Sequence, residues 1–190
     1  MVTIRNERPA DVAAREALLD LAYGPSRFTK PSVRLRERRL PADGLSFVAV
    51  ERGRVVGTVR LWHVTAGPAR PALLLGPLAV HPDCRNRGIG SALVQRAIRE
   101  ARRLGHGIVL LVGDLAFYGR AGFSAEKTGE LWMPGRFERH RLLALELKSG
   151  ALDGARGLIG ATGKAMPRPD LDTLVAAIRG GNRKLMPRAA

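Results

Sequence analysis

The chain of 190 residues holds a single cysteine and no long apolar run, and these absences exclude several protein classes. A lone Cys84 cannot form an internal disulfide framework and fits a reducing compartment. No apolar stretch approaches the roughly 18 residues of a membrane span, and the N-terminus lacks a signal-peptide apolar region. We therefore expect a cytoplasmic protein without membrane association. We also expect no metal, because four histidines and one cysteine give no ligand spacing.

Acidic and aromatic residues are scarce as well. The chain has 17 Asp and Glu against 32 Lys and Arg, a net charge of +15, and only 5% aromatic residues. This balance predicts either an anionic partner or a solvated arginine-rich surface. The basic residues are scattered rather than grouped, and few aromatic residues are available for base stacking. Nucleic acid is therefore the less favoured partner.

The most informative stretch is Leu73–Leu93. The apolar run Leu73–Val80 predicts a buried strand, which should end at His81–Asp83 because proline disfavours a regular element there. The loop Arg85–Gly90 then opens an amphipathic helix that begins near Gly88. The first N–H groups of a helix lack partners and carry the positive end of its dipole. Together with two arginines in the loop, they predict a phosphate or pyrophosphate site.

The glycine pattern narrows the choice of phosphate ligand. It lacks the Lys-Ser/Thr pair of a P-loop, and Leu93 stands where a dinucleotide fingerprint has its third glycine. What remains is Arg-x-x-Gly-x-Gly after an apolar strand. With its flanks PLAVHPDCRNRGIGSALV and the later VGDLAFYGRAGF, this pattern resembles the GNAT superfamily of acyl-CoA-dependent N-acetyltransferases, most of all its YhbS-like branch. The resemblance covers roughly residues 1–148.

The resemblance implies an α/β (α+β) GNAT fold. Its central sheet is mixed and mostly antiparallel, with one splayed parallel pair of strands and helices on both faces. Residues 1–148 would form this domain, and residues 149–190 a glycine-rich basic extension of unknown role. Residue patterns predict strands at Val2–Arg5, Leu45–Glu51, Val55–Val64, Leu73–Val80, Ile108–Val112, Phe123–Lys127 and Leu142–Leu147. They predict helices from Pro9 to Tyr23 and at Arg34–Leu40, Gly88–Leu104, Leu115–Tyr118 and Leu171–Ile178.

The resemblance also implies how acetyl-CoA would bind. Its pantetheine arm would lie between the two parallel strands and pair with the backbone of the strand that ends at Val80. The amides of the glycine loop would hold the pyrophosphate, with Arg85 at the first position of the motif. The cofactor-binding residues implied in this way are Leu78, Ala79, Val80, Arg85, Asn86, Arg87, Gly88, Ile89, Gly90, Ser91 and Tyr118.

Two side chains are candidates for proton transfer. By resemblance, the Tyr118 hydroxyl would protonate the departing CoA thiolate; the alternative is a packed aromatic ring. His63 has a suitable unperturbed pKa for the general base, although a structural or surface histidine is the preferred interpretation. The predicted strand Leu73–Val80 has no acidic residue. Ordered water is therefore expected to take the proton from the amine.

The function that the resemblance implies is transfer of an acetyl or short acyl group from acetyl-CoA to an amine, directly within a ternary complex. One alternative is a non-catalytic acyl-CoA-binding module, and another is an acetyltransferase that acts on aminoacyl-tRNA. Arginines of Arg34–Leu40 could meet an acidic acceptor, although an exposed helix face is preferred. Because many relatives of this fold are dimers, analogy also suggests a homodimer.

Overall fold

The structure, a computed structural model, describes residues 1–167, so the predicted helix Leu171–Ile178 lies outside it. One large sheet has the order β1-β2-β3-β4-β5-β7, and β9 pairs with β3 at its side. The strands are β1 (Val2–Asn6), β2 (Ser46–Glu51), β3 (Arg54–Thr65), β4 (Pro71–Val80), β5 (Ile108–Val112), β6 (Leu131–Trp132), β7 (Leu142–Glu146), β8 (Gly157–Leu158) and β9 (Gly160–Ala161). The helices are α1 (Val12–Tyr23), α2 (Pro31–Arg34), α3 (Ile89–Arg103) and α4 (Leu115–Tyr118).

Within the large sheet, β4 and β5 are parallel, whereas the other pairs are antiparallel. The parallel pairing joins Leu73 to Val109 and Leu74 to Leu110, and the described residues show none beyond Leu74. The register of β3 on β4 also shifts between Val59 and Leu61. The two parallel strands therefore separate from their middle onward, which confirms the predicted mixed sheet with a splayed pair.

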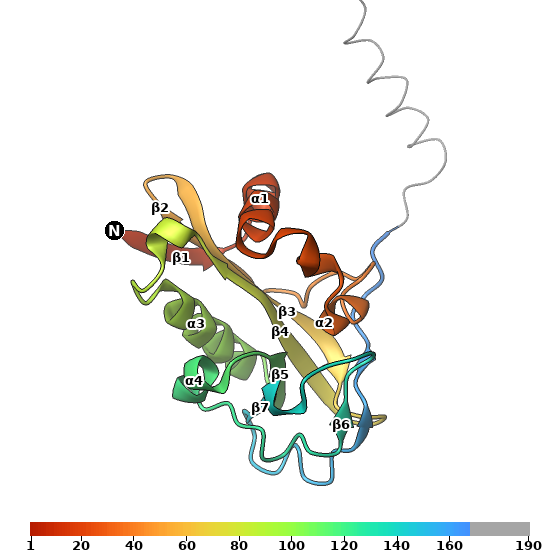
Figure 1. Cartoon of the computed structure of the whole chain (residues 1–190). Coiled ribbons are helices and arrows are strands. Elements are labelled where there is room, and N and C mark those ends of the chain that lie inside the picture. Colours follow the sequence, from red (N-terminus) through yellow and green to blue (C-terminus); the bar gives the residue numbers. More distant parts are fainter. Residues whose placement is uncertain (168–190) are drawn as a thin grey trace, which may run out of the picture.

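Helices cover both faces of the sheet, with α1 and α2 on one side of β3 and β4 and α3 on the other (Figure 1). The spacing of apolar residues predicts one buried stripe on α3, made of Ile89, Ala92, Leu93, Ala97, Ala101 and Leu104. Of these residues, Ile89, Leu93, Ala97 and Ala101 are buried in the main core. The prediction was wrong for Ala92 and Leu104, which are exposed. Val94 and Ile98 are buried in their place, since the buried face extends to that side of the stripe.

Two predicted elements were wrong. A helix covers Pro31–Arg34 rather than Arg34–Leu40, because Pro31 stands at its first turn and a positive φ of 54° at Arg38 ends helical geometry soon after. The predicted strand Phe123–Lys127 is reduced to a single bridge between Ser124 and Ala144. There the chain turns at once, and the Thr128 hydroxyl donates to the Leu142 carbonyl oxygen at 2.8 Å and to the Ala125 carbonyl oxygen at 3.0 Å.

Residues beyond 148 contribute to the same fold as far as the structure describes them. Leu152 and Ile159 are buried in a cluster with Trp62 and Leu110. β8 pairs with β6, and β9 adds to the edge of β3. The division of the chain near residue 148 stays a prediction. The described part of the segment nevertheless packs on the face that carries α1 and α2.

Candidate functional site

The free edge of β4 offers backbone groups to a ligand. The His81 N–H donates to the Val56 carbonyl oxygen of β3 at 2.8 Å. Because successive residues of a strand direct their backbone groups to opposite edges, Leu78 and Val80 direct theirs away from β3, where β5 has already diverged. The Leu78 carbonyl oxygen accepts a hydrogen bond from the hydroxyl of Tyr23 at the end of α1. The Leu78 amide and the backbone of Val80 thus face the gap between the strands.

The loop after β4 prepares an anion site. Gly88 is the N-cap of α3 with φ of 75°, a conformation that glycine adopts without strain, and no side chain caps this helix end. The amides of Ile89, Gly90 and Ser91 therefore stand at the positive end of a 15-residue helix. A Cβ atom at Gly90 would lie 3.4 Å from the Phe117 ring of α4, which is an ordinary contact distance, so α4 packs close to the start of α3.

These parts enclose a hollow of about 610 Å³ between β4, the end of α1, the glycine loop and α4. Its walls contain all the predicted cofactor residues except Arg87 and Tyr118. The predicted residues that line it are Leu78, Ala79, Val80, Arg85, Asn86, Gly88, Ile89, Gly90 and Ser91. The free β4 edge and the α3 N-terminus lie in one hollow, and an extended chain that ends in a phosphate would fit both.

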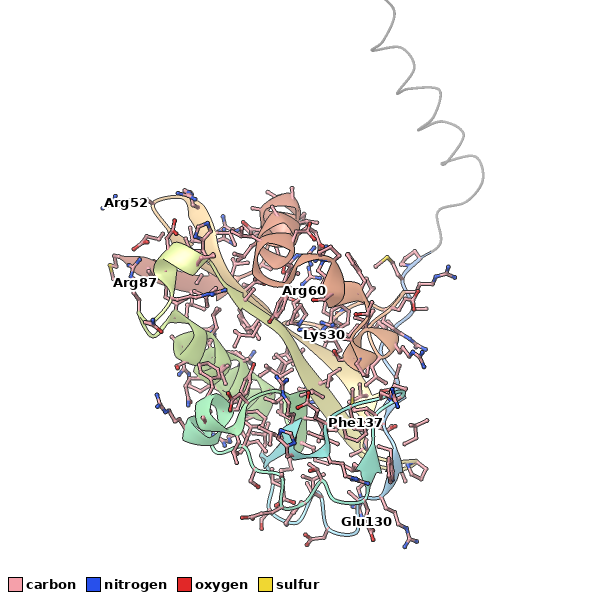
Figure 2. The ribbon with its side chains drawn as sticks, in the orientation of Figure 1. Lys30, Arg52, Arg60, Arg87, Glu130 and Phe137 are labelled. Atoms are coloured by element: carbon pink, nitrogen blue, oxygen red, sulfur yellow. The ribbon has the colours of Figure 1, made fainter. Side chains whose placement is uncertain are left out.

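Arg87 lies outside this hollow. Its guanidinium donates to both carboxylate oxygens of Glu51, at 2.6 and 3.1 Å. This ion pair raises the pKa of Arg87 and lowers the pKa of Glu51. Both residues line a neighbouring cavity beside the Arg52 hairpin, where Figure 2 shows Arg87 next to Arg52. The charge of Arg87 is therefore already neutralised by a carboxylate.

A second, narrower cavity of about 80 Å³ opens where β4 and β5 separate. The chain has only two tyrosines, and both Tyr23 and Tyr118 line this cavity. Burial raises the pKa of Tyr118 well above its usual range, so its hydroxyl stays protonated at neutral pH. The Tyr118 ring packs edge-on against Phe117 and Phe123. A Cβ atom at Gly113 would overlap this ring, so glycine makes room for the tyrosine.

His63 is not brought to either cavity. It lies on β3 opposite Leu73, and its ring centroid is 5.5 Å from that of His106. Leu73 stands at the paired end of β4, whereas Leu78 and Tyr118 stand where the strands have separated. His63 lines neither cavity, so its position does not support a role as the general base.

Sequence reasoning missed the residues that the α1–α2 segment adds to the narrow cavity. Tyr23 was interpreted only as the end of a helix, and Lys30 was not singled out. For Arg36 an exposed helix face was the preferred interpretation and contact with an acidic acceptor the alternative; it lines the cavity together with Tyr23 and Lys30.

Residues 1–167 contain neither a cluster of metal-binding side chains nor a helix that could span a membrane. No three His, Cys, Asp or Glu side chains gather there as a metal site would require. The helices within that part of the chain are each too short or too polar to cross a bilayer. The expectations of no metal and a cytoplasmic location stay predictions.

Comparison with known proteins gives a consistent result. The sequence pattern of the family described as Acetyltransferase (GNAT) family matches residues 14–123. The chain is 31% identical over 163 residues to the uncharacterized N-acetyltransferase YhbS of Escherichia coli (strain K12), covering 82% of this chain and 93% of YhbS. It is 30% identical over 105 residues to the uncharacterized N-acetyltransferase YjhQ of the same strain, covering 54% of this chain and 58% of YjhQ.

Two solved structures extend the similarity to three dimensions. The crystal structure of Escherichia coli YhbS in complex with CoA has a TM-score of 0.70 and 27% identity, covering 85% of this chain and 89% of that one. A GNAT family acetyltransferase from Brucella melitensis, solved in complex with acetyl-CoA, has a TM-score of 0.58 and 26% identity. That match covers 90% of this chain and 94% of the Brucella chain.

Proposed function

The chain belongs to the Acetyltransferase (GNAT) family, and from that premise we propose that it transfers an acetyl group from acetyl-CoA to an amine within a ternary complex. One arrangement supports this proposal above all. The free edge of β4 and the amides at the start of α3 line one cavity, the partly buried Tyr118 lines a second, and the two cavities share Tyr23 and Leu78. The YhbS and Brucella structures, each solved with CoA or acetyl-CoA, share this fold.

The residues that would hold acetyl-CoA follow from this arrangement. The amides of residues 86–91 and the α3 dipole would bind the pyrophosphate, and Arg85 would add a charge-assisted contact. The outward backbone groups of Leu78 and Val80 would pair with the pantetheine arm as a neighbouring strand does. Arg87 would take no direct part, since its guanidinium is paired with Glu51.

The chemistry needs a donor of one proton and an acceptor of another. The neutral amine nitrogen attacks the thioester carbonyl carbon, so that a C–N bond forms and the C–S bond breaks. The amine gives up one proton to water, and the CoA sulfur gains one. Tyr118 would supply this second proton, because its raised pKa keeps the phenol protonated until charge develops on the sulfur. The phenolate is then reprotonated from solvent.

The cofactor site is tested with a matched pair of variants at Ser91, an exposed residue in the first turn of α3. A carboxylate in Ser91→Glu interacts favourably with the helix dipole, which should raise stability by about 0.3–1 kcal/mol. The same carboxylate should repel the pyrophosphate and weaken acetyl-CoA binding about tenfold. Ser91→Gln has a similar size and no charge, and it should retain most of the affinity.

The measurement is thermal unfolding with increasing acetyl-CoA. At about 100 times its dissociation constant, acetyl-CoA should stabilise the wild-type protein by about 2.7 kcal/mol. Equal affinity in Ser91→Glu and Ser91→Gln would contradict a pyrophosphate at α3. If acetyl-CoA stabilises the protein but no amine causes release of CoA, the protein would be a non-catalytic acyl-CoA-binding module rather than an enzyme.

A further inference from the structure

We propose that the acceptor is an amine that also carries an anionic group, a carboxylate or a phosphate, held by Arg36 and Lys30 in the narrow cavity beside Tyr118. This inference rests on the proposed function, because it assigns the acceptor end of the same site. The sequence already offered the arginines of Arg34–Leu40 as an alternative contact for an acidic acceptor; the structure adds Lys30 and the cavity that Lys30 and Arg36 both line. The inference depends on which charges line the cavity and on which of them already have a counter-ion.

The charged side chains that line the narrow cavity are all basic: Arg27, Lys30 and Arg36. Arg27 is neutralised, because it donates to Glu16 at 2.7 Å and to Asp20 at 2.9 Å. In the described part of the chain, Arg36 and Lys30 form no ion pair with a carboxylate. Two positive charges, on the half-buried Arg36 and on the exposed Lys30, therefore line this cavity without a carboxylate partner among the described residues.

Arg36 is held in place by neutral groups. Its Nε donates to the Ser32 carbonyl oxygen at 3.1 Å, and Nη2 lies 3.4 Å from the Ser32 hydroxyl. A guanidinium has five N–H donors in a planar fork, so donors remain for a carboxylate or a phosphate. Burial lowers the pKa of Arg36 to about 10, which leaves it charged at neutral pH and without the counter-ion that a buried charge requires.

Lys30 adds a second cation from the same segment. Its Nζ lies 4.2 Å from the centre of the Tyr23 ring, which fixes the ammonium over the wall of the cavity. Burial and the charges of Arg141 and Arg36 lower the pKa of Lys30. Figure 2 shows Lys30 between α2 and the middle of β4, near the point where the parallel strands separate.

The same charges favour one class of amine over another. A polyamine or another purely cationic acceptor would meet two uncompensated like charges, which disfavours binding. An amine with an anionic group would satisfy Arg36 and Lys30 through that group. The positive surroundings would also lower the pKa of its ammonium and so increase the fraction of neutral, nucleophilic amine.

The test measures binding of acceptor-like products to the CoA-saturated protein by thermal unfolding. The probes are N-acetylated amino acids, the matched N-acetylated amino acid amides, N-acetylphosphoethanolamine and N-acetylspermidine. We expect the acids to bind at least about tenfold more tightly than their amides, as one charge-assisted contact allows. Preference for N-acetylphosphoethanolamine over the acids would identify the anion as a phosphate. Equal binding of acids and amides, or preference for N-acetylspermidine, would overturn the proposal.

Variants test whether the preference for acids over amides depends on Arg36 in the narrow cavity. Arg36→Met should remove the discrimination between acids and amides, and Arg36→Lys should restore part of it. The control Arg38→Met removes an exposed arginine from the same segment and should bind like the wild type. Discrimination that survives in Arg36→Met would contradict the assignment. Stabilisation by CoA itself must persist in all three variants; its absence from the wild type would refute the proposed function rather than the acceptor class.

Discussion

The two ends of the candidate site are built in different ways. The cofactor end consists mainly of backbone groups: the β4 edge at Leu78 and Val80, and the amides that follow Gly88. The proposed acceptor end consists of side chains: Tyr23 at the end of α1, and Lys30 and Arg36 in the segment between α1 and β2. Backbone groups bind the part of a ligand that every family member shares, whereas side chains can change from one protein to another without changing the fold.

This difference predicts that mutations at the two ends act on different kinetic parameters. Substitutions around α3 should change acetyl-CoA affinity and leave the chemical step intact. Substitutions in the narrow cavity should change turnover or acceptor selection and leave acetyl-CoA affinity intact. The three predictions below test this separation.

Tyr118→Phe should have the largest effect. Phenylalanine keeps the ring that packs against Phe117 and Phe123, and removes the hydroxyl proposed to protonate the thiolate. We expect kcat to fall about 100-fold or more, as loss of a general acid does, while the Kd of acetyl-CoA stays within a factor of about two. The measurement is steady-state CoA release together with acetyl-CoA titration. An unchanged kcat would make Tyr118 a packing residue.

The strand, glycine loop and helix of the proposed cofactor end were predictable from the sequence, whereas their binding of acetyl-CoA stays a prediction. A strand, a glycine loop and a helix are local, so their order along the chain already specifies where amides and dipole meet. The splayed strands followed from the resemblance to the GNAT superfamily. Arg87 was the exception, because its partner Glu51 lies 36 positions earlier and no local pattern reveals such a pair.

The geometry of the proposed acceptor end could not be predicted from the sequence, because it depends on contacts between residues that are distant along the chain. Arg36 lines the narrow cavity just after α2, which ends at Arg34, whereas the sequence predicted a helix over Arg34–Leu40, with exposed arginines preferred and contact with an acidic acceptor as the alternative. Tyr23 is fixed by a carbonyl group 55 positions later. The pattern of apolar and polar residues along the chain predicts neither the position of Arg36 nor the contact of Tyr23. His63 shows the converse: it lies on β3 opposite Leu73, at the end of β4 away from both cavities.

Tyr23→Phe should have an intermediate effect. It should impair both the cofactor end and the acceptor end of the proposed site. The Tyr23 ring lines both cavities, and its hydroxyl donates to the Leu78 carbonyl oxygen of the β4 edge. Loss of this bond leaves a partly buried acceptor unsatisfied, which costs about 1–2 kcal/mol. We expect kcat/KM to fall about tenfold for acetyl-CoA and for the acceptor alike. A change in only one of the two would show that Tyr23 belongs to a single end.

Asp11→Asn should have the smallest effect and act on stability alone. Asp11 accepts from Arg5 at 2.6 Å and from the Arg8 amide at 2.8 Å, and these bonds fix the start of α1, the helix that ends at Tyr23. The hydrogen bond from Arg5 is the main cause that lowers the pKa of Asp11 to about 2. The pair therefore stabilises the fold above pH ~4, the unfolded pKa, and this contribution is lost as the pH falls towards ~2.

Because the Arg5 side chain is 29% exposed, solvent screening should reduce this contribution to about 1 kcal/mol at neutral pH. Urea unfolding of the wild type and Asp11→Asn should show that difference at pH 7, and the two curves should converge as the pH falls below ~4. Asp43→Asn removes a carboxylate that is 81% exposed and paired with Lys164, and it should change little at either pH. Acetyl-CoA should bind Asp11→Asn as it binds the wild type, since α1 begins on the far side of the sheet from α3. A stability difference that does not depend on pH would show that Asp11 acts through helix packing rather than through its charge.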